Sequence, residues 1–211
     1  TTDEETDTQG ASKIVDKSRL LKAGKPKYCI VGEPTDLKVV NAHKAAITFS
    51  ATAKGKAAHS STGKGVNANV KLMPFLNTIN NLYQELVIEK EYWDPEFDPP
   101  FPDWNIVIDN YGTAANVTVP VSTCRVNFRY TRKIDPAKIM NKVKESAYAN
   151  GLEFDYWSSG PPFYTPPQSP LVQLGLGLVN QADPYTASYR TDACILNELI
   201  PCIILGPGNV K

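Results

Sequence analysis

The stretch from Ala45 to Trp157 constrains the fold most, because its hydrophobic residues switch repeatedly between the spacing typical of strands and that typical of helices. From Ala45 apolar and polar residues alternate, which predicts a half-exposed strand. A helical spacing, two candidate strands, a second helix and a last strand follow, over residues 66–87, 106–108, 117–130, 135–150 and 152–157. The order strand, helix, strand, strand, helix, strand is that of a ferredoxin-like domain.

The flanking segments predict an α/β domain that this insertion interrupts. A helical spacing from Gly10 to Leu21 precedes the apolar run Tyr28–Val31, which we expect to be a strand covered on both faces. Ile203–Leu205 predicts another buried parallel strand, and the Pro-rich residues 160–170 predict a hinge or linker. The predicted domains are therefore a first part at residues 1–43, an insertion at 44–159 and a second part at 160–211.

The overall charge argues against two classes of partner. Lys and Arg together number 22, as do Asp and Glu, so the chain offers no excess charge for nucleic acid or an anionic membrane surface. No apolar run approaches the roughly 20 residues that a membrane helix needs. The four cysteines are widely spaced without a CxxC pair, which favours reduced, buried thiols and a cytoplasmic enzyme that acts on a small substrate.

Four acidic or imidazole side chains stand out as chemistry-bearing, although each has an ordinary structural alternative. Glu4 and Glu5 could serve as a metal ligand beside a proton carrier, or could simply cap the following helix. Glu33 follows a predicted strand, where α/β folds place ligand sites, yet Gly-Glu-Pro-Thr could be only a turn. His59 lies in a loop of small residues, where a surface histidine is often incidental.

Taken together, several short motifs resemble those of one family in order and wording. They are Thr2-Asp3-Glu4-Glu5, Val31-Gly32-Glu33-Pro34-Thr35, Ala42-His43-Lys44, residues 55–61 followed by Gly65-Val66-Asn67-Ala68, Gly112-Thr113-Ala114-Ala115-Asn116-Val117, Asn127-Phe128-Arg129, Thr191-Asp192-Ala193 and Leu205-Gly206-Pro207-Gly208. The chain resembles the dizinc family of acetylornithine deacetylase, succinyl-diaminopimelate desuccinylase, aminoacylase and carboxypeptidase G. The resemblance implies a zinc-peptidase-like catalytic domain interrupted by a ferredoxin-like dimerisation domain.

The resemblance also implies a reaction, the removal of an acyl group from an N-acyl amino acid by a zinc-activated water. Glu4 would be the general base, while Glu5 and Glu33 would each ligate one zinc ion. His59 would reach the site of a partner subunit in a homodimer and stabilise the oxyanion.

The remaining implied site residues concern the substrate. Asn116 and Arg129 would contact its carboxylate, and Thr191 and Gly208 would line its pocket. Tyr111 stands where acetylornithine deacetylases often have glycine, so the acyl group and the amino acid stay open.

The chain departs from the family in its metal ligands. The family takes further ligands from an HxD motif and a bridging Asp before the Asp-Glu-Glu motif, and from a His after Gly-Pro-Gly. The only histidines of this chain are His43 and His59, and neither matches a ligand position. Two zinc ions per subunit, with cobalt as an alternative, are therefore expected in a complete protein, and we expect this chain alone to be inactive. The alternatives are a non-catalytic dimerisation module and a protein that binds small carboxylates.

Overall fold

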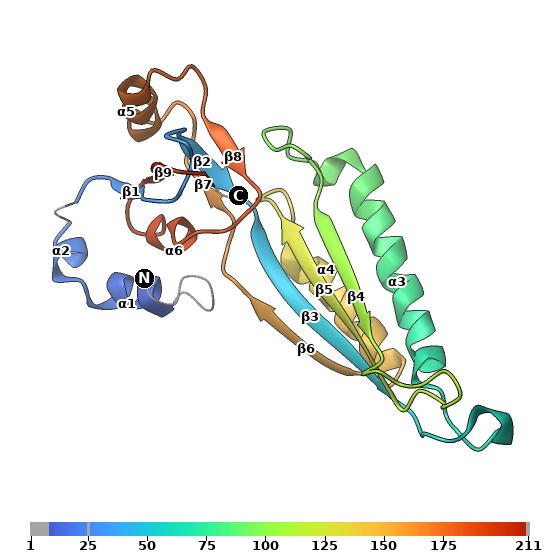
Figure 1. Ribbon diagram of the computed structural model, residues 1–211. Helices are drawn as coiled ribbons and strands as arrows, with labels where there is room; N and C mark the ends of the chain where they lie inside the picture. The colour runs from blue at the N-terminus through green and yellow to red at the C-terminus, as the bar shows by residue number, and fades with distance from the viewer. Residues whose placement is uncertain (1–8, 25, 210–211) are drawn as a thin grey trace.

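The computed structural model describes residues 9–24 and 26–209, whose strands form two separate sheets (Figure 1). The sheet with the longer strands, called the larger sheet, has the order β4-β5-β3-β6, and each pair in it is antiparallel. Its strands are β3 (Ala45–Lys54), β4 (Asp103–Asp109), β5 (Val121–Tyr130) and β6 (Glu153–Ser158). With the two helices between them, they confirm the predicted ferredoxin-like order.

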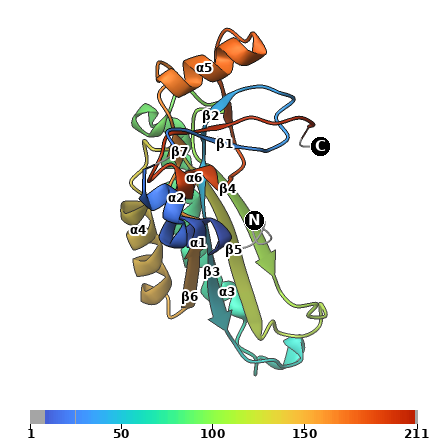
Figure 2. The same ribbon diagram turned by 90° about the vertical axis from the view of Figure 1, so that its left-hand side faces the viewer.

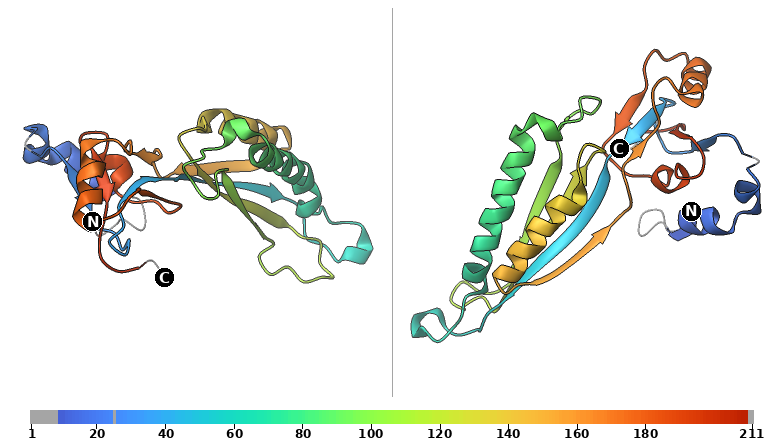
Figure 3. Two further views of the ribbon diagram at one scale, coloured as in Figure 1. Left: turned by 90° about the horizontal axis from the view of Figure 1, so that it is seen from above. Right: turned by 180° about the vertical axis from the view of Figure 1, so that it is seen from behind.

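Two helices cover one face of the larger sheet, α3 (Ala68–Ile88) and α4 (Pro136–Ala149), as the view from above shows (Figure 3). The Asp135 side chain begins α4 by accepting a hydrogen bond from the Ala137 N–H at 3.1 Å. Between helices and sheet, the Trp104 ring packs edge-on against Phe49 and Phe128, with centroids 5.6 and 5.4 Å away. The opposite face of the sheet carries polar side chains, including Asn127, whose amide donates a hydrogen bond to the Thr48 hydroxyl at 3.1 Å.

The smaller sheet lies at one end of the larger one (Figure 2). Its order is β1-β9-β2-β7, with β8 also paired to β2. The strands are β1 (Cys29–Val31), β2 (Val40–His43), β7 (Phe163–Tyr164), β8 (Tyr185–Ala187) and β9 (Cys202–Ile204). The prediction of a buried parallel strand at residues 203–205 is confirmed by β9, which is buried and runs parallel to β1.

Coverage of the smaller sheet differs between the parallel strands β1 and β9. On β9, Cys202 and Ile204 pack towards α6 (Ala193–Leu196), while Ile203 packs with α5 (Pro170–Val179). The expectation that the first strand is covered on both faces was wrong, because Ile30 of β1 is 53% exposed. Cys29 and Val31 face the α6 side, so β1 buries only one face against the described residues.

Two further local predictions needed correction. The first helical stretch is two helices, α1 (Gln9–Lys17) and α2 (Arg19–Lys22), because the Ser18 side chain accepts a hydrogen bond from the Leu21 N–H and begins a new helix. The predicted linker contains β7, whose Phe163 is 1% exposed. Extended backbone suits this Pro-rich segment, and its pairing with β2 gives it a place in the sheet.

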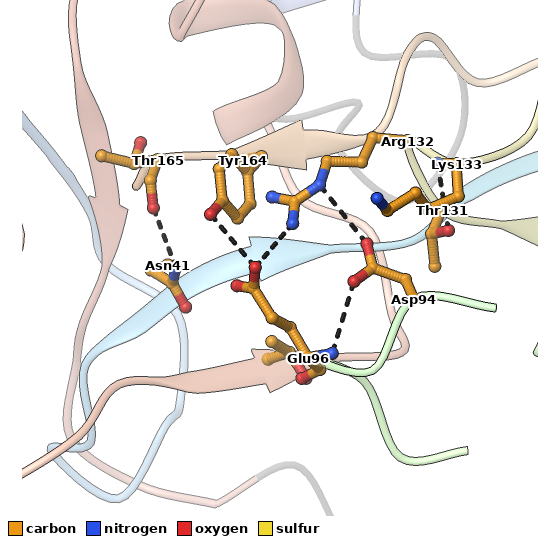
Figure 4. A network of polar contacts seen from close by, with 9 residues as sticks. Asn41, Asp94, Glu96, Thr131, Arg132, Lys133, Tyr164 and Thr165 are labelled. Carbon is orange, nitrogen blue, oxygen red and sulfur yellow. Dashed lines mark hydrogen bonds and ion pairs between the residues drawn. The ribbon is translucent and has the colours of Figure 1, made fainter. Parts of the chain in front are cut away.

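A polar network joins the loop before β4 to the smaller sheet (Figure 4). Arg132 lies with its Nε 3.4 Å from Asp94 Oδ2 and its Nη2 2.6 Å from Glu96 Oε1. Its guanidinium stacks 3.3 Å from the ring centroid of Tyr164 on β7, whose hydroxyl donates a hydrogen bond to Glu96. Lys44, which is 1% exposed, donates hydrogen bonds to the same loop at the Pro99 and Phe101 carbonyls.

Candidate functional site

Glu33 lies just beyond the end of β1, and its backbone is enclosed by the turn that follows β9. The Gly206 carbonyl accepts hydrogen bonds from Thr35 N and Leu37 N at 3.2 and 3.0 Å. Gly206 must be glycine here, since an added Cβ would lie 2.4 Å from the Glu33 carbonyl oxygen. The Gly208 carbonyl also accepts a hydrogen bond from Asp36 N. The structure thus brings the Gly-Glu-Pro-Thr and Gly-Pro-Gly motifs together.

Arg129 and the segment after β8 lie near this turn. The Arg129 Nη1 donates to the Ser188 carbonyl at 3.4 Å, and its Nε donates to Asn127 Oδ1 at 3.1 Å. Burial lowers the pKa of Arg129, and the charge of Asp103, its register partner on β4, opposes that shift. Burial raises the pKa of Tyr189, and the nearby negative charge of Glu33 raises it further. Glu33, Tyr189 and Arg129 therefore gather where the two sheets meet.

A surface hollow of about 320 Å³ borders this group. It is formed by the turn at residues 34–36 and by residues 185–189, with Lys38, Val40 and Asn209. The segment 185–189 thus contributes both a wall of the hollow and the contact with Arg129. Sequence reasoning missed this segment, because its three-residue strand β8 gives no periodic signal.

Thr191 lies close by but is fully buried. Its hydroxyl accepts a hydrogen bond from Ala193 N at 3.1 Å, and its own N–H donates to His43 Nε2 at 3.3 Å. His43 Nδ1 lies 2.9 Å from the Lys44 carbonyl, so a neutral ring that donates from Nδ1 and accepts at Nε2 satisfies both contacts. Burial lowers the pKa of His43 to about 4, and the charge of Arg190 contributes to this shift.

Arg190 is a second cation at this place that sequence reasoning did not single out. Its charge also lowers the pKa of Arg129, which puts the two guanidinium groups within electrostatic reach of each other. The available signal was its position directly before the Thr191-Asp192 motif. Two arginines within electrostatic reach of each other are suited to binding an anionic group such as a carboxylate.

His59 and Asn116 lie together at the opposite end of the larger sheet. A bridge pairs His59 with Val117, and Ser60 N donates to the Asn116 carbonyl at 2.9 Å. His59 is exposed, and its Nδ1 lies 2.7 Å from the Ser61 hydroxyl. The strand β5 separates this loop from Arg129. Its first residue, Val121, lies eight positions before Arg129, which is about 27 Å at the usual rise of a strand. Within one chain, His59 and Asn116 therefore do not meet Arg129 or Glu33.

The described residues do not form a zinc site by themselves. Glu4 and Glu5 lie outside the described residues, and Glu33 is the one predicted ligand inside them. No group of three or more His, Cys, Asp or Glu side chains gathers within residues 9–24 and 26–209. A carboxylate such as that of Glu33 suits zinc, but a tight site needs about four donors.

Comparison with known families decides the relationship. A family model described as the M20 peptidase dimerisation domain matches residues 41–154, which contain the whole β3-to-α4 unit and the start of β6. The chain belongs to the M20 peptidase dimerisation domain family. In the described part of this M20 chain, no helix is long and apolar enough to cross a membrane.

Curated relatives extend the similarity beyond the matched domain. Acetylornithine deacetylase of Buchnera aphidicola subsp. Schizaphis graminum is 29% identical over 220 residues, covering 100% of the M20 chain and 56% of that enzyme. Acetylornithine deacetylase of Aliivibrio fischeri strain MJ11 is 28% identical over 219 residues, with the same shares covered. The M20 chain thus spans about half the length of the curated relatives it matches.

Solved structures support the fold. A tripeptidase from Staphylococcus aureus superposes with a TM-score of 0.68 at 22% identity, over 99% of the M20 chain and 54% of that chain. An M20 family metallo-carboxypeptidase from Sulfolobus solfataricus gives a TM-score of 0.67 at 13% identity, over 92% and 66%. These neighbours confirm the predicted mixed α/β architecture, a peptidase-like domain with a ferredoxin-like insertion.

Proposed function

We propose that this chain is part of a metal-dependent amidohydrolase that removes an acyl group from an N-acyl amino acid, as acetylornithine deacetylase does. The alignment with acetylornithine deacetylases over the whole chain carries the proposal. In this proposal, residues 1–43 and 160–211 belong to the catalytic domain and residues 44–159 belong to the inserted domain. The proposed boundaries then fall between strands of different sheets, β2 and β3 at one side and β6 and β7 at the other.

The proposed roles of the metal ligands and the base come from the resemblance of their motifs to those of the family. Zinc would supply a bound water that ionises near neutral pH, with Glu5 and Glu33 as ligands of one ion each and Glu4 as the base that takes the proton. Arg129, held by Asn127 and the Ser188 carbonyl, would bind the substrate carboxylate at the hollow. Because the only histidines of the chain, His43 and His59, do not match ligand positions of the family, we propose that the 211-residue chain alone has no turnover.

A homodimer would complete the site. The edge strand β4 exposes Ile106, Val107 and Ile108, and the neighbouring helix α3 exposes Val70 and Met73. An apolar edge strand beside an apolar helix stripe favours pairing with a second copy. His59 and Asn116, which cannot reach Arg129 of their own chain, would then act at the partner's hollow, and Thr191 and Gly208 would support the wall of that hollow.

Mixed dimers test this arrangement in the intact protein. His59→Ala and Glu33→Ala homodimers should each be inactive towards N-acetylornithine. After the two variants are mixed, dissociated and reassembled, about a quarter of wild-type activity should return, because half of the dimers would contain one intact shared site. If no activity returns although mixed dimers form, His59 does not act across the interface.

The substrate is tested separately. The intact protein, dialysed with zinc, should hydrolyse at least one compound in a panel of N-acetyl and N-succinyl amino acids, and a chelator should abolish the turnover. Arg129→Met should raise KM far more than it lowers kcat, whereas Glu4→Gln should lower kcat by roughly 10² to 10⁴ and keep the metal. Ligand binding without turnover throughout the panel would instead identify a small-carboxylate-binding protein.

A further inference from the structure

Cys29 and Cys202 are distant in sequence but are direct neighbours in the smaller sheet. They are register partners across the parallel pair β1 and β9, and both belong to the apolar cluster on the α6 side. Neighbouring strands lie about 4.7 to 4.9 Å apart. Cysteines joined by a disulfide have Cα atoms about 4.4 to 6.8 Å apart, so the backbone already holds this pair at a suitable separation.

The two thiols differ in environment, which assigns them different roles. Cys29 is half-buried, whereas Cys202 is fully buried and has its Sγ 3.2 Å from the Ile200 carbonyl. The interaction with the neighbouring Cys202 side chain lowers the pKa of Cys29 to about 7, and the same interaction raises the pKa of Cys202. Burial raises the pKa of Cys124 and of Cys194, so Cys29 is the one thiol of the four with a lowered pKa.

We propose that Cys29 and Cys202 form a redox-active dithiol that a small disulfide such as oxidised glutathione converts into a disulfide linking β1 to β9. The Cys29 thiolate attacks one sulfur of the glutathione disulfide, forming a mixed disulfide and releasing one glutathione thiolate. Cys202 then gives its proton to the released glutathione thiolate and attacks the Cys29 sulfur, which releases the second glutathione. Two protein thiols are oxidised, and one glutathione disulfide is reduced to two thiols.

The position of the pair gives the disulfide a structural consequence. Among the described residues, β9 is the only strand that pairs with β1, which is an edge strand. Glu33 follows β1 closely, and Gly206 follows β9 at contact distance from the Glu33 carbonyl. A covalent link at Cys29 and Cys202 would therefore hold the two strands that lead into this turn. The amide of Cys29, which donates to the Pro201 carbonyl at 2.9 Å, should then exchange its hydrogen more slowly after oxidation.

Peptide mapping tests the proposal on the intact protein. After equilibration with mixtures of reduced and oxidised glutathione, acid quenching and alkylation, trypsin separates residues 28–38, which contain Cys29, from the peptide that begins at Thr191. The oxidised sample should contain these two peptides linked, with the mass of two hydrogens lost. Cys124 should be alkylated to the same extent at every glutathione ratio, which makes it the internal control.

The second peptide also contains Cys194, so variants identify the partner. The link should persist in Cys194→Ser and disappear in Cys202→Ser, where Cys29 should instead retain glutathione. Fragmentation of the linked wild-type peptides gives the same assignment if a variant does not fold. A wild-type protein that keeps glutathione on Cys29 without forming the link, or a link to Cys194, would overturn the proposal.

Discussion

Replacing Arg132 with alanine should destabilise the protein strongly, because the side chain compensates a buried carboxylate. The Asp94 side chain is 0% exposed, and its Oδ2 accepts no hydrogen bond from the described residues. Arg132 Nε lies 3.4 Å from that oxygen, and its guanidinium also contacts Glu96 and the Tyr164 ring (Figure 4). Arg132→Ala would therefore leave a buried charge without its nearest cation.

The contacts set the expected size of the effect. Removing one partner of a buried ion pair costs about 3 to 5 kcal/mol, and the lower end applies because the Arg132 side chain is 30% exposed. The stacking on Tyr164 adds about 0.5 to 1 kcal/mol, and the half-exposed pair with Glu96 adds little. The free energy of unfolding should thus fall by roughly 3 to 4 kcal/mol, which corresponds to a melting temperature lower by about 6 to 16 °C.

Urea unfolding followed by circular dichroism measures this change, with two matched variants. Arg125→Ala removes an exposed pair with Asp109, with side chains 54% and 35% exposed, and should cost less than about 1 kcal/mol. Adding Asp94→Asn to Arg132→Ala removes the uncompensated charge and should recover at least about 1 kcal/mol. A loss below about 1 kcal/mol for Arg132→Ala, or no recovery in the double variant, would refute the reasoning.

Three further predictions concern other parts of the chain. Folding lowers the pKa of His43 from 6.5 to about 4, so its contribution to the free energy of unfolding is full above pH 6.5 and is lost as the pH falls towards 4. Unfolding experiments over this pH range should show that the free energy of unfolding falls by roughly 3 kcal/mol. His43→Gln should remove this pH dependence. Gly55→Ala would place Cβ 2.0 Å from the Val66 carbonyl oxygen and should lower the free energy of unfolding by about 2 to 4 kcal/mol. The control is Gly177→Ala on α5, whose Cβ meets no atom within 4 Å. In thermal melts this control should be neutral or stabilising by about 0.5 to 1 kcal/mol. Val107→Lys on the edge strand β4 should convert a dimer to monomers in light scattering, while a dimer that persists would place the interface elsewhere.

The sequence alone determined the elements whose signals are local. The alternation from Ala45 and the Asp135-Pro136 helix start depend on neighbouring residues, so the order of the inserted domain could be predicted and was confirmed. The short strands β7 and β8 could not be predicted, because two or three residues show no period. Glu33 was identified at a strand end, while the roles proposed for it and the other site residues stay predictions.

Tertiary structure decided which distant residues meet. Cys29 and Cys202 looked like isolated thiols in the sequence, and only the β1–β9 register makes them neighbours. The ten-residue length of β5 separates His59 from Arg129, although both belong to one set of motifs. Periodicity fixes the face on which a side chain lies, but strand pairing depends on burial summed over the whole chain, so these contacts follow from the fold rather than from any local pattern.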